Sequence, residues 1–300
     1  MAGGALDRAM VLANEHPERL LCIVGPTATG KTELAVEMAA RLDGEIISAD
    51  SVQIYRYFDI GSGKPTADEI ARAPHHLVGQ REPTDTIDAV SFAALAESAI
   101  SDIRARGKRP IVCGGTFFWV RSLVMGLVEA PAADQDVRAR HRALVASGGR
   151  SALYEALRTV DPESATRLHP NDVVRVSRAL EVFELSGRKM SDWHADHGFR
   201  AKKHDATMLA LRMDPDALTP RIGARVDRWL AGGWLDEVRA LVERGFGETR
   251  AMQSVGYAEV HAFVSGTLAR DALRDSIVRA TRVFARRQRT WLNHAPVMWL

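Results

Sequence analysis

The chain has 300 residues, of which 46% are hydrophobic, so it is long enough to bury a sizeable core. Its formal net charge is only +2, which excludes a general positive field and requires a local basic face for any nucleic-acid partner. No apolar run approaches the ~20 residues that span a bilayer, so neither a membrane segment nor a membrane partner is expected. The cysteines, Cys22 and Cys113, lie in apolar runs, and we expect free core thiols in a cytoplasmic protein.

A phosphate-binding loop is the first element that the sequence predicts. The apolar run from Leu20 to Val24 is typical of a buried strand, and residues 32–42 have helical spacing. The segment between them reads GPTATGKT, a full match to the pattern GxxxxGK[ST]. Such a loop directs backbone N–H groups and a helix N-terminus at a di- or triphosphate. The predicted phosphate-binding residues are Gly25, Pro26, Thr27, Ala28, Thr29, Gly30, Lys31 and Thr32, and the Thr32 hydroxyl is a candidate Mg²⁺ ligand.

Asp50 follows a second short strand, predicted over residues 45–48. In an open α/β sheet, ligands bind beyond the carboxyl ends of the strands, so Asp50 is expected near the loop. Three interpretations remain open at this point: a carboxylate near a bound Mg²⁺, a general base, or a turn residue.

A helix is predicted over residues 89–106 and a strand over 110–113, which ends at Gly114-Gly115-Thr116. The two glycines permit close approach of a ligand, and Thr116 adds a hydroxyl at the same edge. The aromatic residues that follow, Phe117 to Trp119, are expected to be core residues. His75 and His76 are interpreted as one loop or core histidine and one exposed histidine, not as a metal site.

Between residues 132 and 205 the pattern changes to successive helices without a strand. We interpret this segment as an all-helical insertion domain, within a core formed by residues 1–131 and 206–300. The fold class is therefore α/β: a parallel sheet like that of the P-loop NTPases, flanked by helices. Arg175 and Arg178 share one helix face of the insertion, where solvated surface is their usual environment.

The C-terminal part returns to the core with a strand predicted over residues 207–213 and helices over 221–244 and 268–292, before a closing strand at 297–300. The last helix carries Arg279, Arg282, Arg286 and Arg289 at offsets that place them on one face. Such a face suits the phosphates of a nucleic acid, and an ordinary solvated face is equally open.

Taken in order, the motifs resemble the tRNA dimethylallyltransferase family, also called tRNA isopentenyltransferases. The segments are GPTATGKT, ISADSVQIYRYFDIGSGKPT, APHHLV, GGT, RLHPNDVVRVSRALEVFELSGR, RIGARVDRWLAGGWLDEV, MQSVGYAEV and ATRVFARRQRTWL. They run from Leu21 to the end of the chain, and the later ones are specific to the family.

The resemblance implies that the enzyme transfers a dimethylallyl group from dimethylallyl diphosphate to the exocyclic amine of the adenosine on the 3′ side of the tRNA anticodon. Diphosphate leaves and Mg²⁺ assists, and the loop holds the donor diphosphate instead of ATP. Asp50 accepts the proton of the amine, and Thr116 lies beside the reacting centre. Arg221 or Arg225 contacts the diphosphate, and this choice stays open. A monomer is expected.

The same resemblance implies which residues touch the tRNA anticodon loop. They are Asp50, Ser51, Val52, Gln53, Arg138, Val174, Arg175, Val176, Ser177, Arg178, Gln253, Gly256 and Tyr257, and we add Arg282 and Arg286 from the last helix. The chain departs from the family pattern after GGT, where Phe117-Phe118-Trp119 stands in place of a small residue with Leu-Tyr. Two other classes of function compete: a small-molecule or nucleoside kinase, and a non-catalytic RNA-binding protein.

Overall fold

The computed structural model describes residues 3–128, 130–197 and 202–300. The chain divides into two compact units, one formed by Met1–Val124 with Lys203–Leu300 and the other by Met125–Lys202. The insertion was predicted at residues 132–205. The second unit begins seven residues earlier, at 125, and ends three residues earlier, at 202. In the part of the chain that the structure describes, we find no helix with the length and apolar character needed to cross a bilayer.

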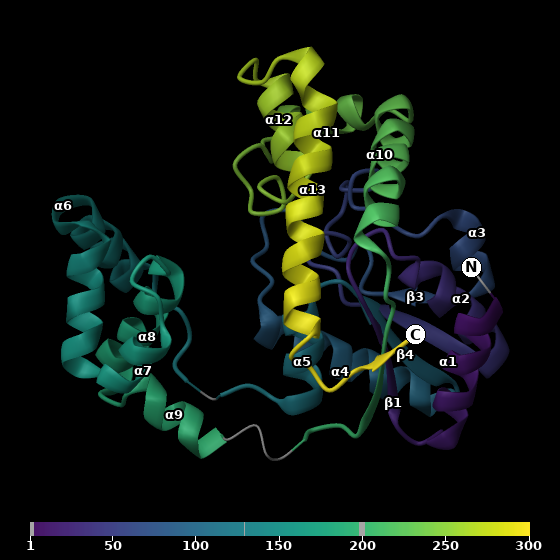
Figure 1. Ribbon diagram of the computed structural model, residues 1–300, viewed down its shortest axis with the longest axis horizontal. Helices are drawn as coiled ribbons and strands as arrows, with labels where there is room; N and C mark the ends of the chain where they lie inside the picture. The colour runs from purple at the N-terminus through teal and green to yellow at the C-terminus, as the bar shows by residue number, and fades with distance from the viewer. Residues whose placement is uncertain (1–2, 129, 198–201) are drawn as a thin grey trace. The chain divides into compact units, whose positions relative to one another are not determined.

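The first unit is built on a six-stranded sheet in which every strand pairing is parallel (Figure 1). The spatial order is β3-β2-β4-β1-β5-β6. The strands are β1 (Leu20–Val24), β2 (Gly44–Ser48), β3 (His75–His76), β4 (Arg109–Gly114), β5 (Ala206–Ala210) and β6 (Met298–Trp299). Because β1 is central and its neighbours are β4 and β5, the segments that follow β1 and β4 meet at one edge.

Helices cover both faces of this sheet, as an apolar β1 requires. Leu21 and Ile23 pack into one core cluster with α1 (Gly3–Glu15) and α2 (Lys31–Leu42). Leu20 and Cys22 point the other way and are equally buried, on the side of α4 (Ala89–Ala105) and α5 (Phe117–Met125). The helix α3 (Ala67–Arg72) lies between β2 and β3 in the sequence. A capping box formed by Thr66 and Glu69 begins it.

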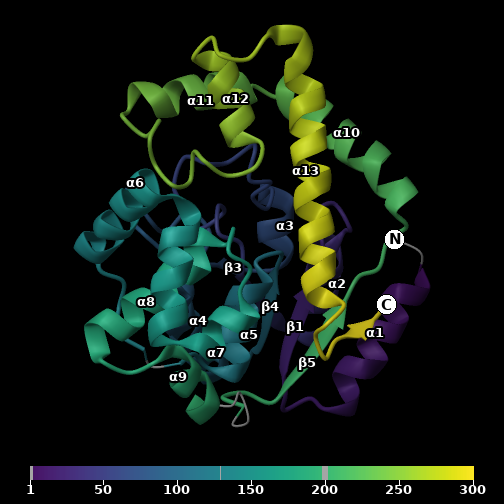
Figure 2. The same cartoon turned by 60° about the vertical axis from the view of Figure 1, so that its left-hand side comes forward.

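The C-terminal helices of the first unit are α10 (Pro215–Ala231), α11 (Trp234–Glu243), α12 (Tyr257–Val264) and α13 (Arg270–Leu292). The helices α10 and α13 lie side by side in both views (Figures 1 and 2). The predicted interruption at Gly232-Gly233 is confirmed, since α10 ends at Ala231 and α11 begins at Trp234.

The second unit contains α6 (Gln135–Val160), α7 (Pro162–Arg167), α8 (Val173–Ser186) and α9 (Met190–His197), and no strand among its described residues. Gly149, with a φ of 74°, interrupts α6, so the two helical segments predicted there are two helices joined across a kink. Its core is formed by Leu153, Leu157, Ala165, Val176, Ala179 and Leu180.

Among the elements of the first unit, α1, α3, α12 and β3 were not predicted from the sequence. In α1, Ala9 and Ala13 are fully buried, and Leu6, Met10 and Leu12 pack against the same core while partly exposed. The strand β3 was predicted as loop, but His75 and His76 pair with Ile46 and Ile47 of β2, and both are half-buried. Two residues are too few for an alternating pattern to show. His76 contacts the Glu45 carboxylate at 2.6 Å, so it has a structural partner.

Candidate active site

The phosphate loop connects β1 to α2, as its motif predicts. Gly30 precedes α2 with a φ of 94°, a backbone conformation that favours glycine. The Lys31 ammonium donates to the Pro26 carbonyl at 2.7 Å, and the Thr29 hydroxyl donates to the same oxygen at 2.9 Å. The loop therefore folds around its own lysine at the N-terminus of α2, where the helix dipole favours an anion.

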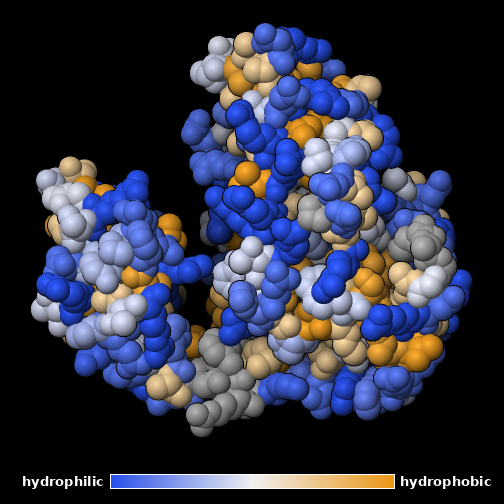
Figure 3. All heavy atoms as spheres, in the orientation of Figure 1, coloured by the Kyte–Doolittle hydropathy of each residue, from blue (hydrophilic) through white to orange (hydrophobic). Residues whose placement is uncertain are grey.

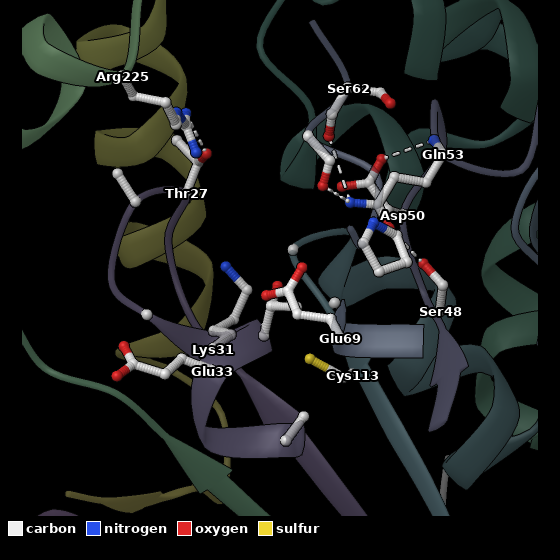
Figure 4. Close-up of a pocket in the computed structure, with 18 of the residues that line it drawn as sticks. Thr27, Lys31, Glu33, Ser48, Asp50, Gln53, Ser62, Glu69, Cys113 and Arg225 are labelled. Atoms are coloured by element: carbon white, nitrogen blue, oxygen red, sulfur yellow. Dashed lines mark hydrogen bonds between the residues drawn. The ribbon is translucent and has the colours of Figure 1, made fainter. Parts of the chain in front are cut away.

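A pocket of about 520 Å³ opens beside this loop, and we call it the loop pocket. Its basic side chains are Lys31, Arg221, Arg225 and Arg228, and its other lining residues include Thr32, Glu33, Ser48, Asp50, Gln53, Glu69 and Cys113. In Figure 4, Lys31 and Arg225 reach the pocket from the side of the phosphate loop, and Asp50 lies across from them. Four cations beside a helix N-terminus suit a diphosphate.

Burial shifts the ionisation of two of these cations. Desolvation lowers the pKa of Lys31 to about 8, although the nearby charge of Asp50 opposes the shift. Desolvation likewise lowers the pKa of Arg225 to about 10, again against Asp50. Both groups lack a full set of counter-charges, so an arriving anion would stabilise their charged forms.

Arg225 is tied to the phosphate loop by a hydrogen bond from its guanidinium to the Thr27 hydroxyl at 2.8 Å. The guanidinium also stacks over the ring of Trp229, 4.5 Å from the ring centroid. Arg221 lies one helical turn earlier on α10 and lines the same pocket. Both arginines that the sequence left as alternatives therefore reach the place where a diphosphate would bind.

Asp50 lies directly beyond β2, at the carboxyl edge of the sheet. Its Oδ1 accepts the backbone N–H of Val52 at 2.9 Å and that of Gln53 at 3.3 Å. Asp50 is therefore a turn residue, one of the three interpretations, and it lines the loop pocket as well. Since the turn uses Oδ1, Oδ2 is the oxygen that can accept a proton from a ligand.

A second pocket of about 540 Å³ adjoins the loop pocket. The two share four lining residues: Thr27, Asp50, Ser62 and Arg225. The second pocket also contains predicted RNA-contacting residues, namely Ser51, Val52, Gln253 and Gly256. Asp50 thus borders two adjoining cavities, the loop pocket and the second pocket.

Thr116 lines the second pocket, and its Oγ1 accepts the backbone N–H of Ser51 at 3.1 Å. Its own N–H donates to the Ala49 carbonyl at 3.1 Å, so the turn after β4 is fixed to the turn after β2. The structure therefore brings Asp50 and Thr116 together, although 66 positions separate them in the sequence.

Aromatic and apolar side chains at the second pocket were missed by the sequence analysis. Phe117 and Trp119 are core residues as expected, but Phe118 is 49% exposed and lines this pocket. Phe284 and Val255 line it too, each 37% exposed. Exposed aromatic groups that line a cavity are typical of surfaces on which bases stack. For Phe118, the sequence signal was the departure from the family pattern after GGT.

Two predicted RNA contacts of the first unit have structural partners instead. Tyr257 is fully buried, and its hydroxyl donates to Glu237 at 2.6 Å, so it has no surface to offer to RNA. The side-chain amide of Gln53 accepts from the Ser48 hydroxyl and donates to the carbonyls of Ser62 and Gly63. Gln53 lines the loop pocket while it holds this turn in place.

The predicted RNA contacts of the second unit divide between surface and interior. Val174 is 80% exposed and Arg175 is exposed as well, but Val176 is a core residue at 1% exposure. The Ser177 hydroxyl lies 2.8 Å from Nδ1 of His141.

Two more of these residues, Arg138 and Arg178, both pair with Glu181, whose side chain is fully buried. Burial opposes ionisation of Glu181, but hydrogen bonds from the two arginines outweigh it and hold its pKa below the ordinary value. These two arginines therefore serve the fold of their unit first.

The basic face of α13 lines a further hollow, of about 910 Å³. Arg279, Arg282, Arg286 and Arg289 all border it, together with Arg212 of the segment after β5. Figure 3 shows hydrophilic side chains over much of the exposed length of α13. The shared face that the spacing predicts is thus present in the folded chain.

In the described ranges we find no group of three or more histidine, cysteine, aspartate or glutamate side chains that could hold a metal ion. Thr32, the predicted Mg²⁺ ligand, lines the loop pocket beside Lys31. A Mg²⁺ ion that binds with a diphosphate needs few protein ligands, because phosphate oxygens and water complete its shell. The Thr32 hydroxyl, together with oxygens of a bound diphosphate and water, thus fits such an ion.

The fold and site define an α/β protein of the P-loop class with a basic pocket at the carboxyl edge of its sheet. The family model described as IPP transferase matches residues 53–295. The tRNA dimethylallyltransferase of Sorangium cellulosum is 58% identical over 96% of this chain and 92% of its own length. That of Anaeromyxobacter dehalogenans (strain 2CP-C) is 48% identical over 94% of each chain.

Solved structures agree. The tRNA isopentenylpyrophosphate transferase of Bacillus halodurans superposes with a TM-score of 0.70 at 36% identity, covering 94% of this chain and 89% of that one. A eukaryotic dimethylallyltransferase described as acting on tRNA gives 0.80 at 28% identity, over 94% and 73%. The chain belongs to the IPP transferase family, as its motifs predicted.

Proposed function

We propose that the protein transfers a dimethylallyl group from dimethylallyl diphosphate to the exocyclic amine of the adenosine adjacent to the 3′ side of the tRNA anticodon. The family and its named relatives support this activity. One observation in this chain supports it most: Asp50 lies where an anion-binding pocket and a second pocket adjoin. A reaction between a diphosphate ester and a base needs this arrangement.

In this proposal the donor diphosphate occupies the loop pocket. Backbone N–H groups of residues 28–32, the Lys31 ammonium and the guanidinium of Arg225 or Arg221 bind its oxygens. When the C–O bond of the donor breaks, its electron pair goes to the leaving diphosphate, and these groups stabilise the added charge. Mg²⁺, held by Thr32 and the diphosphate, would supply further charge neutralisation.

The target adenosine occupies the second pocket, with its amine toward the donor carbon. An adenine amine is a weak nucleophile because the ring delocalises its lone pair. Asp50 accepts the amine proton on Oδ2 as the C–N bond forms, which is the role of a general base. Thr116 presents a hydroxyl beside the same amine. The base reaches the pocket only when it is turned out of the anticodon loop, at a cost of about a few kcal/mol.

The remaining RNA contacts are proposed on the surfaces that the structure leaves accessible. They are Ser51, Val52, Gln253 and Gly256 at the second pocket, Val174 and Arg175 on the second unit, and Arg282 and Arg286 on α13. The working species is proposed to be a monomer. Two buried free thiols suit the cytoplasm as its location.

Purified protein with Mg²⁺, dimethylallyl diphosphate and unmodified tRNA tests this proposal. The tRNA is digested, its nucleosides are identified by mass spectrometry, and an ATP-only reaction runs in parallel. We expect prenylated adenosine at the position 3′ of the anticodon and release of diphosphate. Phosphate transfer from ATP without a prenyl adduct would instead establish a kinase.

A further inference from the structure

Gln288 of α13 connects the two strand-end segments that carry the site. Its side chain is 7% exposed, and both ends of its amide are used. The Thr27 backbone N–H donates to its Oε1 at 2.8 Å, and its Nε2 donates to the Gly115 carbonyl at 2.8 Å. A glutamine is one of the few side chains that can accept and donate at once in this way.

The contact with Gly115 depends on the absence of a side chain there. A Cβ atom at Gly115 would lie 2.5 Å from Nε2 of Gln288. A real Cβ does not approach a nitrogen so closely, so the amide fits a space that only glycine leaves. The second glycine of the GGT motif therefore has a specific structural partner, supplied from 173 residues further along the chain.

Each end of this bridge leads to a residue of the proposed reaction. On one side, Thr27 accepts a hydrogen bond from Arg225 at 2.8 Å and lines the loop pocket. On the other side, Gly115 is followed by Thr116, which holds the Ser51 N–H at 3.1 Å, next to Asp50. Gln288 thus connects the phosphate loop, where the prenyl donor would bind, to the Asp50 and Thr116 segments, where the adenosine would bind.

We infer that Gln288 is a positioning residue, which sets the position of the bound donor relative to the adenosine whose amine attacks the donor carbon. This inference rests on the proposed function. The amide touches neither substrate in this account and acts only through Thr27 and Gly115. A misplacement of about 1 Å costs on the order of 10²-fold in rate when two reacting groups must be aligned.

Two variants separate the two hydrogen bonds. Gln288→Met has a similar length and shape but makes neither bond. Gln288→Glu keeps the acceptor for Thr27 but places a carboxylate oxygen against the Gly115 carbonyl. At saturating donor and tRNA, we expect turnover to fall about tenfold or more in both variants. We expect the KM for tRNA to stay within about twofold, because the amide does not face RNA.

A buried residue of the same helix supplies the matched control for stability. Leu273 is 2% exposed and lines none of the three pockets. Leu273→Ala should lower the melting temperature at least as much as Gln288→Met and leave turnover of the folded enzyme within about twofold. Wild-type turnover in folded Gln288→Met, or an equal loss in Leu273→Ala, would reduce Gln288 to a structural contact.

Calorimetry with inorganic diphosphate supplies a readout that does not depend on prenyl transfer. Gln288→Met should bind diphosphate about fivefold or more weakly than the wild type, since the loop amides are no longer held in place. If the wild-type protein transferred no prenyl group but this difference remained, the proposed function would fail and the role of Gln288 in loop geometry would stand. Equal diphosphate binding with equal turnover would overturn the inference.

Discussion

Lys31 shows how one residue joins the electrostatics of the fold to the chemistry of the site. Its ammonium is enclosed by the phosphate loop and donates to the Pro26 carbonyl. Desolvation lowers its pKa to about 8, so in the folded protein this lysine loses its proton just above neutral pH. A diphosphate would restore the missing counter-charge and favour the protonated form.

Donor binding should therefore weaken as the pH rises through the pKa of Lys31. Only the charged form attracts the diphosphate, and a phosphate ester is fully ionised above pH ~7.5 because its second pKa is about 6. Between pH 7.5 and 9.5, we expect affinity for dimethylallyl diphosphate to fall by up to about tenfold per pH unit, as measured by calorimetry.

The matched control is Lys31→Arg, whose guanidinium stays charged over this range. Its donor affinity should be weaker throughout and nearly independent of pH. Equal pH dependence in the two proteins would assign the titration to another group.

At the residue scale, sequence reasoning succeeded where a motif is contiguous and failed where exposure decides. The phosphate loop, Asp50 and Thr116 line the pockets because strand ends of a parallel sheet meet at one edge. Tyr257 and Val176 stand within motifs of the family, but both are buried. A motif records which residues are neighbours and not which of them face a ligand. For Val176, helical spacing from Ala179 and Leu180 would have indicated the core face.

At the element scale, α13 has one face that packs in the core and one face that carries arginines. Its buried face carries Leu273, Ile277, Thr281, Ala285, Gln288 and Leu292, at spacings of three or four residues. Its other face carries four arginines that line the hollow of about 910 Å³: Arg279, Arg282, Arg286 and Arg289. Spacing predicted the arginine face, but the contacts of Gln288 could not be predicted, because they depend on Thr27 and Gly115, far away in the chain.

The arginine face should contribute to tRNA binding through phosphates. Arg282→Ala with Arg286→Ala should weaken tRNA binding, measured by filter binding or anisotropy over a series of salt concentrations. If both contact phosphates, the slope of log K against log salt becomes less steep by about 1.4, from about 0.7 per contact for single strands. Prenyl transfer at saturating tRNA should change little.

Removal of two exposed arginines elsewhere controls for net charge. Arg41 and Arg72, on α2 and α3, are exposed and border none of the three pockets. Arg41→Ala with Arg72→Ala should leave the salt slope as it is in the wild type. A slope unchanged by the α13 substitutions would return that face to ordinary solvated surface.

At the scale of the whole molecule, the active site is an assembly of segments that are distant in sequence. The sheet order β2-β4-β1-β5 brings Thr27, Asp50 and Thr116 to one edge, and the helices α10 and α13 add Arg225 and Gln288. The sequence predicted the α/β class and most of its strands from short apolar runs. It could not predict that two pockets adjoin at Asp50, because that depends on how α10 and α13 pack above the sheet.

The central claim is that Asp50 acts as the base between a bound donor and a bound adenosine. Asp50→Asn is the most direct test, since an amide oxygen can keep the turn bonds to Val52 and Gln53 but accepts no proton. Donor and tRNA affinity, melting temperature and single-turnover prenyl transfer are measured on the same preparation. We predict near wild-type binding and stability with turnover reduced by about 10²-fold or more. Full turnover in Asp50→Asn would contradict the account.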